Sequence, residues 1–239
     1  MEVIYEDNHI IIVNKSPGEI VQGDKTGDEP LVEIVRRYIK EKYSKPGNVF
    51  CGVVHRLDRP VHGLVVFAKT SKALERMNRM FRDGEVKKTY RAITRNLPPK
   101  PADRLTGYIT STERNNKSYV WASPREGAKK AVLSYRLIAS SDRYHMLEVN
   151  LETGRKHQIR VQLASIGCPI RGDLKYGDKR SNPDGSISLQ AHSIEFIHPV
   201  SKIPVRVTAP APAESLWQAF DSIIDRSKPD ESSDTNQPN

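Results

Sequence analysis

The sequence predicts an α+β fold built on a largely antiparallel sheet. Two observations support this prediction: segments with a strand pattern follow one another in runs, and few helical segments separate them. The regular alternation of strands and helices that is typical of parallel sheets does not occur in this sequence. The chain has 239 residues, and a chain of this length buries about 70% of its unfolded surface without needing disulfides.

A hairpin and a helix are predicted at the start of the chain. Strand patterns over 3–6 and 9–15 flank a turn at Asp7-Asn8. Apolar residues then recur at helical spacing from 31 to 39. Pro30 suits the first turn of that helix, where a missing backbone N–H costs nothing.

A buried strand and a second helix are predicted next. Residues 63–68 form an apolar run of strand length. Ser71 can cap a helix, and Leu74, Met77 and Phe81 fall on one face of it.

The rest of the chain consists mainly of predicted strands, with two more helices. The strands cover residues 87–94, 107–112, 118–122, 131–139, 144–151, 187–197 and 205–208. A short helix from about 157 to 166 ends at Gly167, a residue suited to the left-handed position after a helix, and an amphipathic helix covers 214–225. One folded domain is therefore expected over 1–226. Residues 227–239 are polar, lack large apolar side chains, and are expected to be a disordered tail.

The net charge indicates a polyanionic partner. The formal charge is +9 and the isoelectric point is about 9.5, values typical of proteins that bind nucleic acid. Basic residues are concentrated in two stretches, 69–95 and 155–180. In one domain these stretches could line a groove for a phosphate backbone, and two solvated faces are the alternative.

Several classes of protein are disfavoured by the sequence. No apolar run approaches the roughly 18 residues of a membrane span, and the first residues do not resemble a signal peptide. The two cysteines, Cys51 and Cys168, predict reduced thiols in a cytoplasmic protein. Cys51 and His55 have no second pair at metal-binding spacing. No nucleotide-binding glycine motif occurs, and neither a metal nor a cofactor is expected.

One candidate site lies in the segment 54–64, Val-His-Arg-Leu-Asp-Arg-Pro-Val-His-Gly-Leu. Asp58 stands between Arg56 and Arg59, and Pro60 and Gly63 imply a tight, fixed path. Asp58 could simply cap the turn or pair with an arginine. Alternatively, neighbouring guanidinium groups keep it ionised for use as a nucleophile or base.

A second candidate site lies in the segment 151–163. Thr153 and Gly154 turn the chain out of a strand. Three basic residues then fall near a helix N-terminus, whose free N–H groups favour phosphate; they are Arg155, Lys156 and His157. Arg160 lies three positions beyond His157, on the same side of the helix, and can point back toward the turn. A plain exposed helix is the alternative.

Together these segments resemble the signature blocks of the RluA family of RNA pseudouridine synthases. The family blocks read roughly H-R-L-D-x-x-T-S-G-L, T-G-R-x-H-Q-I-R-V-H-x-A and G-x-P-I-x-G-D-x-x-Y-G. The chain matches them in family order, with His55–Asp58 and Gly63-Leu64, with Thr153–Arg155 and His157–Val161, and with Gly167–Asp173 and Tyr176-Gly177. Residues 14–18 and 88–92 are similar to the family's N-K-P-x-G and K-x-Y-x-A blocks.

The resemblance implies a mixed, mainly antiparallel sheet with flanking helices and a central cleft, which would be basic here. It implies isomerisation of uridine to pseudouridine in RNA by base flipping, without a cofactor or metal. Asp58 matches the catalytic aspartate, Tyr90 the tyrosine that packs on the base and can take a proton, and Arg160 the basic partner of the aspartate. Arg56 matches the arginine that fills the gap left by the flipped base.

The resemblance leaves the RNA substrate open. Val61-His62 stands where the family usually has Thr-Ser, and Lys156 and Gln162 also depart from the blocks. The substrate is expected to be transfer or ribosomal RNA, bound by a monomer without an extra N-terminal RNA-binding domain. Candidate RNA-binding residues besides Arg56 are His55, Arg59, His62, Arg155, Lys156 and His157. A non-catalytic RNA-binding or assembly factor and a base-excising hydrolase are the alternative functions.

Overall fold

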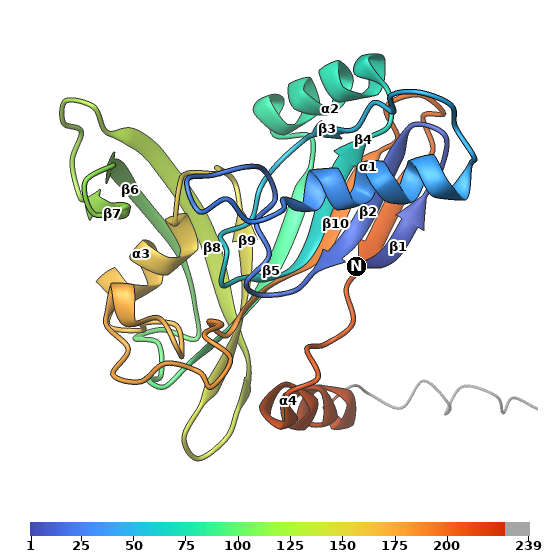
Figure 1. Cartoon of the computed structure of the whole chain (residues 1–239). Coiled ribbons are helices and arrows are strands. Elements are labelled where there is room, and N and C mark those ends of the chain that lie inside the picture. The colour runs from blue at the N-terminus through green and yellow to red at the C-terminus, as the bar shows by residue number, and fades with distance from the viewer. Residues whose placement is uncertain (228–239) are drawn as a thin grey trace, which may run out of the picture.

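A computed structural model describes residues 1–227 and shows one sheet that runs through the whole molecule (Figure 1). The strands are β1 (Glu2–Glu6), β2 (Ile10–Lys15), β3 (Gly52–Val53), β4 (His62–Ala68), β5 (Lys87–Thr94), β6 (Ala102–Thr112), β7 (Lys117–Trp121), β8 (Lys129–Ser140), β9 (His145–Leu151), β10 (Leu189–Ile197) and β11 (Pro204–Thr208). The helices are α1 (Leu31–Lys42), α2 (Ser71–Asp83), α3 (Gln158–Ser165) and α4 (Ser215–Arg226), with a short 3-10 turn, η1 (Leu174–Tyr176).

The sheet is mixed and mainly antiparallel. Its strand order is β1-β2-β4-β10-β5-β9-β8-β6-β7, with β3 paired to β4 and β11 paired to β10. Among the described strands the pairings are antiparallel except that of β10 with β4, where Gln190 lies opposite His62 and Ala191 opposite Gly63. The predicted α+β fold with a mixed, mainly antiparallel sheet is therefore confirmed.

Helices α1 and α2 cover the two faces of the N-terminal part of the sheet. On β2, Ile11 and Val13 pack with the α1 residues, whereas Ile10 and Ile12 pack with the α2 residues. Successive side chains of a strand point to opposite faces, so a strand covered on both faces is apolar throughout. This explains the continuous apolar runs of β2 and β4, which align in antiparallel register.

The other two helices cover the second half of the sheet. Helix α3 contributes Ile159 and Leu163 to a core cluster with side chains of β5, β8 and β9. Trp217 and Phe220 of α4 pack with Ile93 of β5 in a separate cluster. Arg160 therefore lies on a helix, α3, whose neighbouring apolar side chains are part of the core.

Most predicted elements are present, with small shifts at their ends. The cap of α2 is Thr70, not Ser71, because the Thr70 hydroxyl accepts the backbone N–H of Ala73. Strand β6 begins at Ala102, five residues before the predicted start at 107. The predicted tail, 227–239, lies outside the described residues apart from Ser227, which follows α4. No helix within residues 1–227 is long and apolar enough to cross a membrane.

Candidate active site

The loop between β3 and β4 carries Asp58 and is fixed at several points. The Val61 N–H donates to the Asp58 carbonyl at 3.0 Å, which closes a turn, and the Ile187 N–H donates to the Pro60 carbonyl at 3.0 Å. The Asp58 side chain remains 28% exposed. The loop thus presents a carboxylate to solvent from a constrained backbone.

Lys15 ties this loop to the N-terminal hairpin. Its side chain is buried, and its ammonium group donates to the carbonyls of Ser16, Arg59 and Val61 at 2.9–3.0 Å. Burial lowers the pKa of Lys15 to about 8, although the charges of Glu19 and Asp58 oppose this shift. The Lys15 ammonium group therefore connects the end of β2 to two backbone carbonyls of the Asp58 turn.

Gly63 brings the end of the same loop against strand β10. Its φ is +111°, and a Cβ at this position would lie 2.3 Å from the Ala191 carbonyl oxygen. Only glycine permits both this conformation and this approach. The glycine of the sequence motif is thus required by the parallel contact between β4 and β10.

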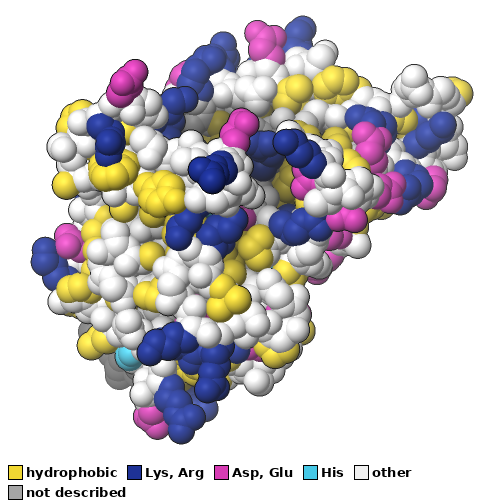
Figure 2. All heavy atoms as spheres, turned by 60° about the vertical axis from the view of Figure 1, so that its left-hand side comes forward, with side chains coloured by type: hydrophobic (Ala, Val, Ile, Leu, Met, Phe, Trp, Pro, Cys, Tyr) yellow, Lys and Arg dark blue, Asp and Glu magenta, His cyan; other side chains and the backbone are white. Residues whose placement is uncertain are grey.

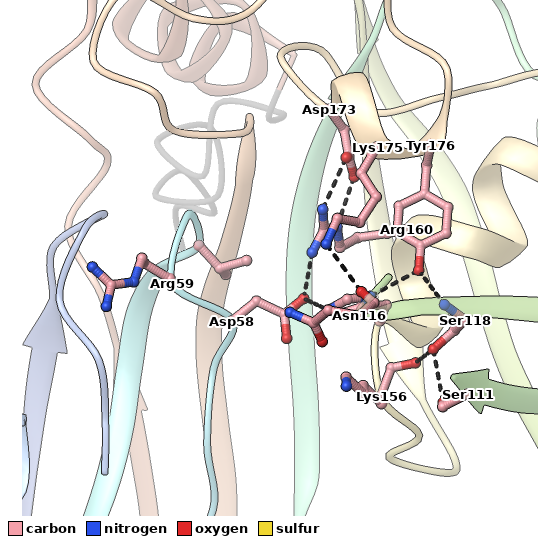
Figure 3. Close-up of polar contacts among 12 residues, drawn as sticks. Asp58, Arg59, Ser111, Asn116, Ser118, Lys156, Arg160, Asp173, Lys175 and Tyr176 are labelled. Atoms are coloured by element: carbon pink, nitrogen blue, oxygen red, sulfur yellow. Dashed lines mark hydrogen bonds and ion pairs between the residues drawn. The ribbon is translucent and has the colours of Figure 1, made fainter. Parts of the chain in front are cut away.

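Arg160 links Asp58 to a second carboxylate (Figure 3). Its Nη1 donates to Asp58 Oδ2 at 2.9 Å, while Nε and Nη2 donate to the two oxygens of Asp173 at 2.7 and 2.9 Å. Burial disfavours the charge on Arg160, but the contacts with Asp173 and Asp58 outweigh burial and raise the guanidinium pKa. Arg160 is therefore a permanent cation held in a fixed orientation beside Asp58.

Asp173 is a site residue to which the sequence motifs assign no role. Its side chain is 1% exposed, and the paired geometry with Arg160 is the bidentate arrangement that guanidinium and carboxylate groups favour. Asp173 belongs to the Gly-Asp-x-x-Tyr block at 172–176, and this block is the sequence feature from which its place in the site could have been predicted.

Tyr90 lies at the buried floor of the same region. It is 8% exposed and packs in a cluster with Val61 and Ile159, the neighbours of the Asp58 turn and of Arg160. Burial, together with the charge of Asp58, raises the pKa of its hydroxyl. The three predicted catalytic residues, Asp58, Tyr90 and Arg160, are thus brought into one region from a loop, a strand and a helix.

His157 is buried next to Asp58 rather than exposed at the start of α3. It is 8% exposed and has a left-handed backbone, with φ of 55°. Its Nδ1 lies 2.7 Å from the Tyr176 hydroxyl, and its Nε2 lies 3.7 Å from Asp58 Oδ2. The left-handed turn directs the ring inward, so His157 belongs to the surroundings of Asp58.

The predicted RNA-binding arginines and lysine fall into two groups. Arg56, Arg155 and Lys156 are exposed. Arg59 is paired with Asp28 at 2.7 Å, and this contact holds the preceding loop.

The other two histidines among the predicted RNA-binding residues, His55 and His62, have different surroundings. His55 accepts the Val66 N–H at 3.1 Å and stacks on Phe81, and burial lowers its pKa to about 3. His62 lines a cavity of about 580 Å³ together with Lys15 and Gln190. Asp58 does not line that cavity. The ring nitrogens of His55 and His62 are thus not placed beside the Asp58 carboxylate.

The face of the molecule drawn in Figure 2 carries both basic and acidic side chains. Figure 2 shows Lys and Arg side chains in several groups on this face, some of them around a hollow near its centre. Basic side chains close to Asp58 include Arg160 and Lys175, whose pKa is lowered by burial and by the Arg160 charge. A surface of this kind suits a phosphate backbone.

A family model described as RNA pseudouridylate synthase matches residues 9–165. The chain belongs to this family. The match contains Asp58, Tyr90 and Arg160, and the resemblance to the RluA family is confirmed.

Curated pseudouridine synthases are similar along almost the whole chain. The ribosomal large subunit pseudouridine synthase D of Zymomonas mobilis is 32% identical over 224 residues, which cover 90% of this chain and 70% of that protein. The tRNA pseudouridine synthase C of Vibrio cholerae is 29% identical over 238 residues, which cover 92% of this chain and 94% of that protein.

The fold is shared with a solved structure of the human RNA pseudouridylate synthase domain containing 4. The TM-score is 0.76 at 21% identity, and the alignment covers 94% of this chain and 93% of that chain. The arrangement of strands and helices is therefore that of a pseudouridine synthase.

Proposed function

We propose that this pseudouridine synthase isomerises uridines in structured transfer or ribosomal RNA, with Asp58, Arg160 and Tyr90 as its catalytic residues. The observation that carries the proposal is the hydrogen bond of 2.9 Å between Arg160 Nη1 and Asp58 Oδ2. It joins residues 102 positions apart in the chain and keeps a partly exposed carboxylate beside a permanent cation.

The reaction is a rearrangement without an external reactant. The bond between the ribose C1′ and N1 of uracil breaks, the base rotates, and a bond forms between C1′ and C5. A proton leaves C5 and a proton is gained at N1, so the product has the mass of the substrate. The base must first leave its stack, at a cost of a few kcal/mol, and contacts between basic side chains and the RNA backbone offset this cost.

Each proposed residue has a role that follows from its surroundings. Asp58 supplies the carboxylate that reacts with the nucleotide, and Arg160 orients it through their hydrogen bond. Tyr90 offers an aromatic face for the uracil and a hydroxyl for proton transfer. Arg56, Lys156 and Arg155 are exposed, and we assign them to RNA contact, with Arg56 filling the space of the flipped base.

Residues 1–226 form the catalytic domain in this proposal, because β10 lies between β4 and β5 and joins the two halves of the sheet. We expect a monomer in the cytoplasm, where the free thiols of Cys51 and Cys168 would stay reduced. Light scattering of the purified protein and fractionation of cells measure these two properties.

The Asp58→Asn variant tests the proposed chemistry. Because Asn has the shape of Asp, folding and RNA affinity should stay close to wild type while pseudouridine formation is lost. The assay is mass-resolved nucleoside analysis of RNA after reaction. Asp103→Asn is the control, because Asp103 pairs only with surface Lys100 among its charged neighbours in residues 1–227.

The products separate the possible functions. Pseudouridine supports the proposal, free uracil with an abasic site indicates a hydrolase, and unchanged uridine indicates an RNA-binding factor. Turnover of Asp58→Asn within about tenfold of wild type removes Asp58 from the mechanism. A map of pseudouridine in cellular RNA with and without the gene identifies the substrate.

A further inference from the structure

A chain of polar contacts through Tyr176 and His157 reaches Asp58. The Ser118 backbone N–H donates to the Tyr176 hydroxyl oxygen at 2.8 Å, a contact drawn in Figure 3. The same hydroxyl lies 2.7 Å from His157 Nδ1. The chain ends at His157 Nε2, which lies 3.7 Å from Asp58 Oδ2. Ser118, His157 and Tyr176, which come from three segments of the chain, are therefore connected to the Asp58 carboxylate.

The contacts on the two sides of the His157 ring favour one of its two neutral tautomers. The Ser118 N–H can only donate, so the Tyr176 oxygen accepts it and its own hydrogen can point to His157 Nδ1. Nδ1 is then an acceptor, and a neutral ring carries its single proton on Nε2. The opposite tautomer would direct a lone pair of Nε2 at the Asp58 carboxylate, which is electrostatically unfavourable.

The charged surroundings keep the His157 ring neutral. Burial lowers the pKa of His157 to about 4, and the cations Arg160, Lys175 and Lys156 act in the same direction. Only Asp58 opposes them among the charges that face the ring within residues 1–227. Tyr176 is itself uncharged, because burial raises its pKa.

The backbone at His157 is held in an unfavourable conformation. With φ of 55° it lies in the left-handed region, which only a few per cent of residues other than Gly adopt, although Asn, Asp and His do so more often than the rest. The side chain of Gln158 stabilises this turn by accepting the Arg155 N–H at 2.9 Å and the Thr153 hydroxyl at 2.8 Å. Strain of this kind is typical of positions where a side chain must face a reacting group.

We propose that His157 is a positioning residue, a neutral Nε2–H donor that holds Asp58 Oδ2 together with Arg160. The inference rests on the proposed function. Both contacts fall on Oδ2, which leaves Oδ1 to face the nucleotide. The present separation of 3.7 Å is longer than a hydrogen bond, and contacts of this kind tighten when substrate is bound.

Two substitutions at His157 separate this role from a structural one. Gln carries an amide N–H close to the place of Nε2, whereas Asn is too short to reach Asp58. The left-handed backbone, in contrast, favours Asn over Gln. We therefore expect His157→Asn to be at least as stable as His157→Gln. Its kcat should nevertheless be lower by about tenfold or more, with KM little changed in both variants.

His198 provides the matched control. It is also buried, its Nε2 lies 2.8 Å from Asp7 Oδ2, and its Nδ1 accepts two backbone N–H groups. It lies outside the site, in the turn after β10. His198→Gln and His198→Asn should change stability without an effect on kcat.

A measurement without RNA tests the inference independently of activity. Nitrogen-15 NMR of the histidine rings should show His157 as the neutral Nε2–H form at pH 7, and Tyr176→Phe should weaken this preference. A protonated ring, a neutral ring with the proton on Nδ1, or equal kcat of the Gln and Asn variants would overturn the role of His157. Absence of pseudouridine formation by the wild type would overturn the proposed function, while the NMR result would still report on His157.

Discussion

Arg160→Met removes a cation that two carboxylates share, and the consequences for folding and for turnover can be calculated separately. Asp173 is 1% exposed, so its charge would stay buried without a partner. Removal of one member of a buried ion pair destabilises a protein by about 3–5 kcal/mol. Asp58 is 28% exposed, and water can replace part of what it loses. Most of the expected loss of stability therefore comes from Asp173.

The expected kinetic effect comes from the other contact. A hydrogen bond to a charged group contributes roughly 1.5–3 kcal/mol. If the bond of Arg160 to Asp58 acts in the transition state, its loss lowers the rate by roughly 10- to 150-fold. Single-turnover formation of pseudouridine at saturating enzyme measures this effect without interference from RNA release.

The double variant Arg160→Met, Asp173→Asn distinguishes the two effects. The amide that replaces the Asp173 carboxylate would carry no charge, so most of the stability lost in Arg160→Met should return in urea unfolding experiments. The rate should stay low, because Asp58 still lacks its cation. Recovery of both stability and rate in the double variant would show that Arg160 serves only the fold, and unchanged stability of Arg160→Met would refute the calculation for Asp173.

Three further outcomes are expected. Tyr90→Phe keeps the aromatic ring, so it should bind RNA normally and lose turnover, whereas Tyr90→Leu should impair both; a fully active Tyr90→Phe would reduce this residue to a packing surface. RNA affinity should fall with salt, with a log–log slope of about −0.7 per phosphate contacted, and Lys156→Glu should reduce affinity and slope together; an affinity independent of salt would contradict RNA contact. Burial lowers the pKa of His55 to about 3 in the fold, so below a pH of about 6.5 the unfolded state binds an extra proton. As the pH decreases from there, His55 alone should lower the stability by up to about 1.4 kcal/mol per pH unit, and His157 and His192, whose pKa values burial lowers to about 4, add to the slope. Urea unfolding between pH 7 and 4 measures this slope, which His55→Gln should flatten.

Local patterns predict most of the fold because the buried strands are apolar on both faces. The differences between the predicted and the observed ends of the elements have local causes as well. Residues 102–106 alternate between exposed and half-buried, so the first part of β6 carries no apolar signal. The two-residue strand β3 and the short turn η1 are shorter than any period that a sequence pattern can reveal.

The sequence motifs predict which residues belong to the candidate site, but not all of the contacts between them. The family resemblance places Asp58 and Arg160 together, but the bidentate contact of Arg160 with Asp173 depends on how α3 and η1 pack. The sequence predicts that His157 contacts RNA at the surface. The structure buries this residue, because its backbone is left-handed, and no sequence pattern indicates that conformation here. The contacts of Lys15 join the first hairpin to the Asp58 loop across 44 and 46 residues, a separation that no local pattern encodes.

The position of β10 has a consequence for the order in which the molecule can assemble. This strand comes from residues 189–197 but pairs with β4 on one side and β5 on the other. Contacts between residues so distant in sequence form slowly, because closing a long loop precedes any gain from pairing. During synthesis the strand that follows the Asp58 loop and the strand that carries Tyr90 therefore stay unjoined until nearly the whole chain has left the ribosome. We expect nascent chains that end before β10 to bind no RNA productively, so that each molecule becomes active only when its last strands are in place.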